Sequence, residues 1–307
     1  MSGDHRLNLA LSHHDAGRYT QAIDILTQLL ADNPDEALYH GLLASCLLAR
    51  KRLTAAEYEL DIALGQAPNV PYLHLVRARL LLVKRKVDDA ITACDDALAL
   101  DPQLVDAWLV KASLLMTAER ATDSRACLDE AARLAPSDIA VVVGLGDYCN
   151  WRGDHKEALQ HATEALRINA GSEAANLLMG ETQLALGNEP EAEYHAKFAI
   201  TQNPNSQSAL RLFVNIRMRR NLFIGVWWRF NHWIAGLGTQ KSALVLIAGF
   251  LAFNMASQIA ADLGYAGAAA TLSYAWLLLV IYSWVGIPMY HKALEKELAS
   301  FSFNPRF

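Results

Sequence analysis

Histidine, cysteine and aspartate are the side chains in this sequence that could bind a metal ion or move a proton. The chain has ten histidines and four cysteines, and the cysteines form no CxxC pair. His13 and His14 adjoin, but neighbouring residues point apart on a helix and no third ligand lies close by in the sequence. The acidic residues between 88 and 96 lack the spacing of a calcium loop, so we interpret them as a solvated helix face.

The sequence also lacks the short motifs of common catalytic chemistry. It contains no HExxH zinc-protease motif, no GxxxxGK(S/T) phosphate loop and no GxSxG nucleophile elbow. We therefore expect a protein that is not an enzyme, with no cofactor, no metal and no small-molecule substrate. The apolar core of a secretory signal is absent from the first residues, so we expect free thiols rather than disulfides.

The elements that must position any binding residue recur every 34 residues. Prolines recur with this 34-residue period at Pro34, Pro68, Pro102, Pro136 and Pro204, and Ala170 occupies the one remaining equivalent position. We call these six positions the proline stations and the 34-residue period the beat. A small residue stands twelve positions before each station, at Ala22, Ala56, Ala90, Ser124, Ala158 and Ala192. Paired helices approach closely where side chains are short, and a proline cannot continue a helix. The beat therefore predicts six helix pairs.

Glycine occupies the predicted turn inside three of the pairs, at Gly17, Gly153 and Gly187. Glycine permits a positive φ there. The equivalent turns near Lys51, Lys86 and Glu119 have no glycine, so the sequence leaves their shape open.

The pattern resembles the tetratricopeptide repeat family. The segments GRYTQAIDILTQLLADNPDE (17–36) and GDHKEALQHATEALRINAGS (153–172) are similar to its turn and second helix, and Trp108 occupies its aromatic station. The resemblance covers residues 3–206. It implies an all-α, right-handed solenoid of six helix pairs, each packed mainly on its neighbours.

Composition divides the chain after the repeats. The predicted repeats are 3–36, 37–70, 71–104, 105–138, 139–172 and 173–206. We then expect a capping helix over 207–220, a tryptophan-rich interfacial helix over 221–240, a transmembrane hairpin over 242–291 and a cytoplasmic tail over 292–307.

In the family that this chain resembles, the first helix of each pair lines a groove that binds a partner. The family's contact stations, transferred by phase, predict a groove of Tyr72, Leu75, Arg79, Leu109, Ser113, Met116, Val143, Asp147, Asn150, Trp151, Leu177 and Glu181. The alternative interpretation is that some of the leucines only pack between helices.

The predicted groove lacks the clamp by which chaperone-binding members of the family hold a C-terminal carboxylate. Arg79 is the only basic residue among the predicted groove residues, and leucine or valine occupies the clamp station in the third to sixth repeats. We expect an apolar groove with an acidic end at Asp147 and Glu181. Such a groove suits an amphipathic helix or an extended apolar segment that carries a basic residue.

Charge is distributed unevenly along the chain. Residues 1–206 carry 18 Lys and Arg against 29 Asp and Glu, and this net charge of −11 disfavours nucleic acid as a partner. Residues 207–307 carry 9 against 3, a net charge of +6. This basic part is also strongly apolar, which favours a membrane as its partner.

Two apolar, uncharged stretches lie in the basic part, over 243–261 and 266–290. A spanning helix needs about 20 largely apolar residues. We therefore predict spans over about 242–261 and 267–290, and the short connection forces an antiparallel hairpin. Asn254 and Gln258 share one face of the first span. They bind either the second span or the membrane helix of a partner.

Tryptophans and arginines precede the hairpin and predict contact with lipid at the membrane surface. The predicted interface residues are Arg219, Arg220, Trp227, Trp228, Arg229 and Trp233. The alternative interpretation is a collar that packs against the last repeat. Basic residues flank the hairpin on both sides and its connection has none, so both termini are expected in the cytoplasm. A bacterial inner membrane is the preferred setting, and an organelle membrane facing the cytosol is the alternative.

Two functions agree with these features. The first is a membrane-anchored scaffold that recruits or assembles partner proteins at the cytoplasmic face of a membrane. The second is an accessory or regulatory subunit of a membrane enzyme or transporter, in which the hairpin makes the main contact. The partners expected are one or more proteins, another membrane protein among them, together with membrane lipid.

Overall fold

The structure is a computed structural model that describes residues 3–203, 206–220, 239–265, 267–272 and 274. Helices and short turns make up this described part, and it contains no strand, so the predicted all-α class is confirmed. The chain divides into two compact units, Met1–Ala185 and Leu186–Phe307. The division falls inside the sixth predicted repeat, between its two helices.

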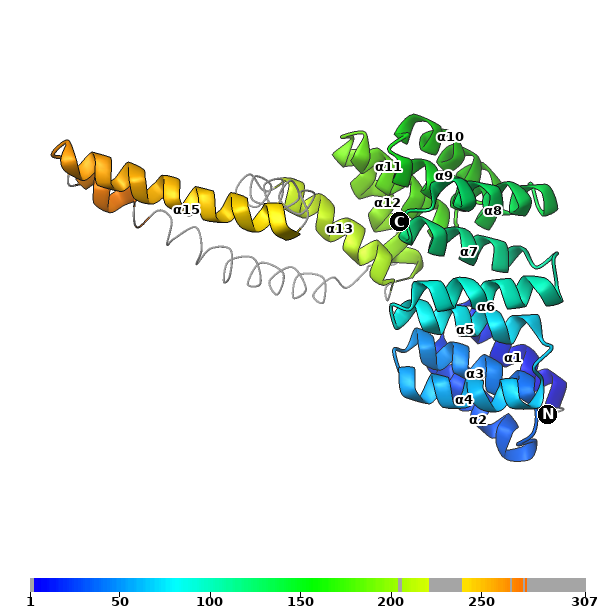
Figure 1. The fold of residues 1–307 in the computed structure, drawn as a ribbon. Coiled ribbons are helices and arrows are strands. Elements are labelled where there is room, and N and C mark those ends of the chain that lie inside the picture. Colours follow the sequence, from blue (N-terminus) through cyan, green and yellow to red (C-terminus); the bar gives the residue numbers. More distant parts are fainter. Residues whose placement is uncertain (1–2, 204–205, 221–238, 266, 273, 275–307) are drawn as a thin grey trace. The chain divides into compact units, whose positions relative to one another are not determined.

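The first unit consists of helix pairs that follow one another in chain order (Figure 1). Their first helices are α1 (Gly3–Asp15), α3 (Ala37–Ala49), α5 (Pro71–Val83), α7 (Val105–Thr117), α9 (Ile139–Arg152) and α11 (Glu173–Ala185). Their second helices are α2 (Tyr19–Asp32), α4 (Leu53–Gln66), α6 (Val87–Leu100), α8 (Ala121–Leu134) and α10 (His155–Ile168). Each first helix begins at the residue where the 34-residue beat begins a repeat.

Helices α3, α5, α7 and α9 each pack on the second helix of their own pair and on the first helix of the next pair. Helix α11 is the last first helix of this unit and packs on α9. We call α3, α5, α7, α9 and α11 the first-helix row. This arrangement of neighbours on neighbours is that of a solenoid. It places equivalent residues of successive repeats side by side along the row.

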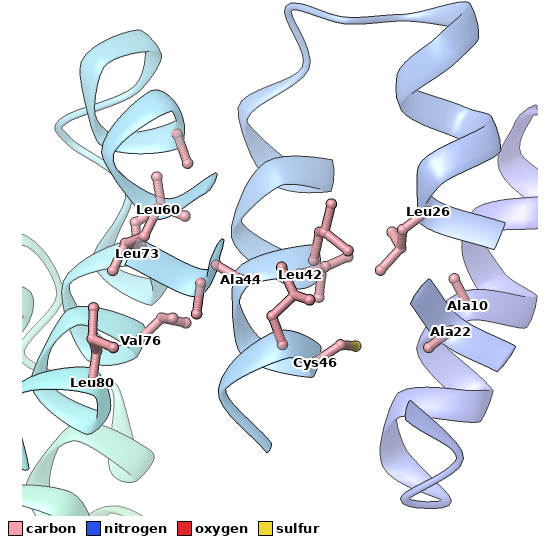
Figure 2. Packing of buried hydrophobic residues seen from close by; sticks show 14 of the residues in the cluster. Ala10, Ala22, Leu26, Leu42, Ala44, Cys46, Leu60, Leu73, Val76 and Leu80 are labelled. Atoms are coloured by element: carbon pink, nitrogen blue, oxygen red, sulfur yellow. The ribbon is translucent and has the colours of Figure 1, made fainter. Parts of the chain in front are cut away.

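Small residues make the close packing possible. The six residues twelve positions before the proline stations are at most 2% exposed. Figure 2 shows Ala10 and Ala22 together between α1 and α2, with Leu26 beside them. Ser124 takes the place of an alanine because its hydroxyl donates a hydrogen bond to the carbonyl of Ala112, at 2.9 Å.

The turns inside the pairs all have the same left-handed shape. Six residues spaced by 34 have a positive φ, between 59° and 87°: Gly17, Lys51, Arg85, Glu119, Gly153 and Gly187. At Glu119, the amide of Arg120 donates to the carbonyl of Leu115 at 2.8 Å, the long bond of a Schellman motif. The turns that the sequence left open therefore match the glycine turns, although three of them use a residue with a side chain.

A second periodic bond closes the turn between one pair and the next. The fourth residue of a first helix bonds to the carbonyl at the preceding proline station. The bonds run from His40 to Pro34, His74 to Pro68, Trp108 to Pro102 and Asn176 to Ala170, at 2.7–2.9 Å. These polar side chains are thus explained by a structural hydrogen bond that caps the preceding turn.

The second unit contains α12 (Glu189–Gln202), α13 (Gln207–Arg220) and α15 (Thr239–Asp262). Helix α13 coincides with the predicted capping helix and packs on α12. Its buried face consists of Ala209, Leu212, Phe213 and Ile216, which are at most 3% exposed.

Helix α15 covers the first predicted span and ends in a turn at Gly264, which has a φ of 84°. Residues 267–272 are helical again, and the Ser257 hydroxyl donates to the carbonyl of Ala269 at 2.9 Å. The chain therefore turns back on itself, as the short connection predicts. Among the residues described, no helix has both the length and the apolar character needed to cross a membrane. Residues 221–238 and 275–307, with most of the second predicted span, lie outside the described residues.

Candidate functional site

The first-helix row carries all twelve residues predicted to line a partner-binding groove. Four of them are exposed: Ser113, Asp147, Trp151 and Glu181. Seven are half-buried: Tyr72, Arg79, Leu109, Met116, Val143, Asn150 and Leu177. The remaining residue, Leu75, is buried.

Leu75 corrects the predicted groove. It is 1% exposed and packs in a cluster with Leu98 and Ala107. A side chain so enclosed cannot contact a partner, so its assignment to the groove is wrong. Leu75 therefore agrees with the alternative interpretation, in which some of the leucines only pack between helices.

Other apolar residues of the row also serve partly in packing. A Cβ on Gly144 would lie 3.2 Å from Leu109, so Leu109 rests on the backbone of the neighbouring α9. Val143 packs against buried residues of two adjacent clusters. The apolar side chains predicted for the groove therefore pack largely between the helices. The surface of the row that a partner could reach is more polar than expected.

Asn150 also has a structural role. Its amide donates to the Thr182 hydroxyl at 2.8 Å, and its oxygen lies 3.1 Å from Nδ1 of His155. The residue thus links α9 to both α10 and α11. Thr182, which carries the other half of this link, has no distinguishing pattern in the sequence and was not among the predicted site residues.

Two carboxylates come together at one end of the row. Asp147 on α9 and Glu181 on α11 occupy equivalent positions of successive repeats, and their helices pack on each other. Desolvation and the charge of Glu181 raise the pKa of Asp147 to about 7. Desolvation also raises the pKa of Glu181. Neighbouring atoms partly desolvate both carboxyl groups, yet both residues remain exposed at the surface. A cation from a partner could therefore reach them, and its charge would offset both the desolvation and the repulsion.

An arginine lies toward the other end of the row. Arg79 on α5 is half-buried, and its charge acts on the neighbouring Tyr72, whose pKa is raised chiefly by burial. Ser113 on α7 occupies the equivalent position between Arg79 and Asp147. The row therefore changes from basic at α5 to acidic at α9 and α11.

An aromatic pair borders the acidic end. Trp151 is 43% exposed, and its ring centroid lies 6.0 Å from that of Tyr148 at an interplanar angle of 41°. Trp151 stands one helical turn after Asp147 on α9. An exposed tryptophan one turn from a carboxylate is well suited to bind a cationic or apolar side chain of a partner.

The structure also assembles a group that the sequence did not predict. Sγ of Cys149, a carboxylate oxygen of Glu157 and a ring nitrogen of His161 all lie within 4.8 Å of one another. Burial raises the pKa of Cys149 to about 11 and lowers that of His161. No contiguous motif marks this group, because its members lie on either side of the Gly153 turn.

The residues predicted to meet the membrane are described only in part. Arg219 and Arg220 end α13, whereas Trp227, Trp228, Arg229 and Trp233 lie outside the described residues. Asn254 and Gln258 are exposed on α15, and the Asn254 amide donates to the carbonyl of Phe250 in its own helix at 3.4 Å. Among the described residues, Ser257 bonds across the turn. Most of the second predicted span, which Asn254 and Gln258 are predicted to contact, lies outside the described residues.

Comparison with known families agrees with this architecture. A family model described as a tetratricopeptide repeat matches residues 7–71, 75–139 and 109–173, which together make up more than half of the chain. None of the curated proteins matches the sequence significantly.

Several solved structures are similar in fold. A structure of the Cut9–Hcn1 complex of the APC/C matches 87% of this chain and 51% of its own, with 14% identity and a TM-score of 0.60. The type IV pilus biogenesis factor PilW matches 68% and 97%, with 18% identity and a TM-score of 0.52. A tetratricopeptide repeat protein from Parabacteroides merdae matches 71% and 86%, with 14% identity and a TM-score of 0.50. At these identities the likeness concerns the fold alone.

Proposed function

The chain belongs to the tetratricopeptide repeat family, and we propose that its first-helix row binds an extended segment of a partner protein. The observation that carries this proposal is the pair of exposed carboxylates, Asp147 and Glu181, with the exposed Trp151 one helical turn after Asp147 on α9. A lysine or arginine of the partner would bind between the two carboxylates. Its charge would offset the desolvation and the repulsion by Glu181 that together raise the pKa of Asp147.

The change of charge along the row also predicts how far apart the charged residues of the partner segment lie. In the first-helix row, Arg79 on α5 and Asp147 on α9 are separated by two helix-to-helix steps. Packed helices lie about 8–10 Å apart, so about 16–20 Å separates the two charges. An extended chain covers that distance in about five or six residues at 3.3 Å each. The preferred partner segment therefore carries an acidic residue and a basic residue about five or six positions apart.

A selection from a random peptide library tests this proposal. The full-length chain, immobilised in mild detergent, is compared with the double variant Asp147→Asn, Glu181→Gln. We expect peptides with the acidic and basic pair to be enriched on the unaltered chain and lost on the variant. Asp89→Asn, an exposed change on α6 outside the first-helix row, is the matched control and should keep the enrichment. Identical peptides from all three proteins would contradict the proposal.

Attachment to a membrane is the second part of the proposal. It is supported by the uncharged stretch 266–290, by the basic residues that flank the predicted hairpin and by the exposed apolar side chains of α15. Among these, Phe250, Leu251, Met255 and Ile259 are 46–61% exposed, which is costly in water. We propose that the repeats and both termini lie in the cytoplasm, with a bacterial inner membrane as the setting. A scaffold placed there would hold its partner at the membrane surface.

The alternative function, an accessory subunit of a membrane enzyme or transporter, predicts that the hairpin makes the main contact. Asn254 and Gln258 are exposed on α15 and suit that contact. Once a partner is known, Asn254→Leu with Gln258→Leu can be compared with Asp147→Asn with Glu181→Gln in the full-length chain. Loss of the partner in the first variant alone would favour the subunit, and loss in the second alone would favour the scaffold.

A further inference from the structure

A cysteine, a glutamate and a histidine, none of them assigned to partner binding, meet in the fifth helix pair, close to the Tyr148–Trp151 pair. Cys149 is on the last turns of α9, whereas Glu157 and His161 are one turn apart on α10. Their ligand atoms lie within 4.8 Å of one another. Within the described residues, no other three His, Cys, Asp or Glu side chains have their ligand atoms this close together.

We propose that Cys149, Glu157 and His161 form a binding site for a divalent transition-metal ion of the zinc type. Sulfur, imidazole nitrogen and carboxylate oxygen are the three donors that zinc accepts in proteins. Zinc with bonds of about 2.0–2.3 Å needs tetrahedral ligands about 3.5 Å apart, so the three atoms have only to close by about 1 Å. Water completes the fourth position.

The helical hairpin fixes these ligands before any ion binds. Glu157 and His161 are four residues apart, so both point from one face of α10. The Schellman turn at Gly153 sets the angle between the helices, with a bond of 2.8 Å from the Asp154 amide to the carbonyl of Cys149. Gly146 allows close approach, because a Cβ there would lie 3.2 Å from the Cβ of His161.

An open cavity gives an ion access to two of the ligands, Cys149 and Glu157. A space of about 550 Å³ is lined by Cys149, Glu157, Asp154, Tyr148, Arg125 and Arg152. Asp154 and Glu157 supply negative charge beside the thiol. Arg125 and Arg152 oppose a cation. The charge of Arg125 is shared with Asp129, to which it donates a hydrogen bond at 2.8 Å.

The protonation states agree with a site that loads by displacing a proton. The lowered pKa of His161 keeps its imidazole neutral and able to donate an electron pair to the metal. The thiol of Cys149 holds its proton in the metal-free chain, since its pKa is about 11. On binding, the metal takes the thiolate and the proton leaves to the solvent. Apparent affinity should therefore increase with pH.

Zinc and cobalt titrations of the full-length chain test the site. The chain is stripped with a chelator, kept reduced and in mild detergent, and titrated with zinc against a chromophoric chelator. We expect one zinc per chain with affinity rising from about pH 6 to about pH 8, and a thiolate-to-cobalt absorption band when cobalt replaces zinc. Zinc should also raise the melting temperature, because it binds the folded state.

The variants Cys149→Ser, Glu157→Gln and His161→Asn should each weaken zinc binding more than tenfold and remove or alter the cobalt band. Even groups that only orient a ligand are worth about 10–100-fold. Cys127→Ser, at another buried cysteine, and Glu164→Gln, on the same α10, are the matched controls. Glu157 and His161 are only half-buried, so their variants remain informative if Cys149→Ser does not fold. Equal zinc affinity in all six proteins, or a cobalt complex without a thiolate band, would overturn the proposal.

Discussion

Lys51, Arg85 and Glu119 adopt a left-handed backbone that favours glycine. Their φ values are 59–61°, and glycine occupies the equivalent position in the other three turns. The left-handed conformation costs a residue with a Cβ about 1–2 kcal/mol. These three turns are therefore the places where a single substitution should stabilise the repeats.

Replacing Glu119→Gly should raise the free energy of unfolding by about 1 kcal/mol, because glycine removes the conformational strain. Chemical denaturation followed by circular dichroism measures this change. Gly17→Ala is the reciprocal control and should lower stability by a similar amount. Unchanged or reduced stability in Glu119→Gly would show that the turn is not strained.

The carboxylates of Asp147 and Glu181 predict a pH dependence of stability. Their pKa values are raised in the folded chain, whereas unfolded Asp and Glu titrate near pH 4. Between about pH 4 and pH 7, Asp147 keeps in the folded state a proton that it has lost in the unfolded state, and the raised pKa of Glu181 acts in the same direction. The free energy of unfolding contributed by these groups is therefore full below about pH 4 and falls as pH rises toward 7.

Glu181→Gln should reduce that fall, because it removes one carboxylate and its repulsion of the other. The melting temperature of the variant should match that of the unaltered chain near pH 4 and exceed it near pH 8. Asp106→Asn, an exposed change on α7, should show a smaller difference between the two pH values. A Glu181→Gln variant that is less stable at pH 8 would refute the assigned repulsion.

At the scale of the element, the spacing between helices depends on short side chains. A Cβ on Gly146 would lie 2.5 Å from a methyl group of Leu178, on α11. Gly146→Ala should therefore destabilise the chain by about 1–3 kcal/mol through overpacking. A Cβ on Gly65, within α4, would meet no atom within 4 Å, so Gly65→Ala should stabilise by about 0.5–1 kcal/mol. Denaturant midpoints of the two variants that shift in the same direction would contradict this role of the short side chains.

The helix pairs were predictable because their determinants are local and periodic. The periodic prolines mark the ends of the second helices, and the periodic small residues mark where helices touch. Each first helix begins at the residue where a repeat was predicted to begin. Position within the packed row is different, because it depends on neighbours from adjacent repeats. Leu75 belongs to the core and Leu109 rests on Gly144, and neither fact follows from a station number alone.

The Cys149, Glu157 and His161 group could not be predicted from sequence motifs for a related reason. Its residues are too far apart to form a motif, and they meet only because the chain reverses at Gly153. A usable signal existed in the phase of the repeat, since Cys149 and Glu157 stand four residues on either side of the turn. Residues placed in this way face each other across a helix pair.

At the scale of the whole molecule, the apolar C-terminal part should decide where the chain is found. If the second part of the proposed function is right, the full-length chain remains with membranes after washing with high salt and alkaline carbonate. Detergent should release it. A cysteine placed at Gly264 should react with an impermeant reagent from outside intact cells, and one placed in 297–307 should not. Recovery of the washed chain in the soluble fraction would refute membrane attachment.

The most direct test of the central claim is a double-mutant cycle between Glu181 and the basic residue of a selected peptide. Binding is measured for both forms of the chain, unaltered and Glu181→Gln, with the peptide carrying either lysine or glutamine. A direct contact predicts a coupling energy of about 0.5–3 kcal/mol that decreases with added salt. A coupling energy of zero, with both peptides bound equally by both proteins, would contradict the claim that the acidic end of the first-helix row binds the partner.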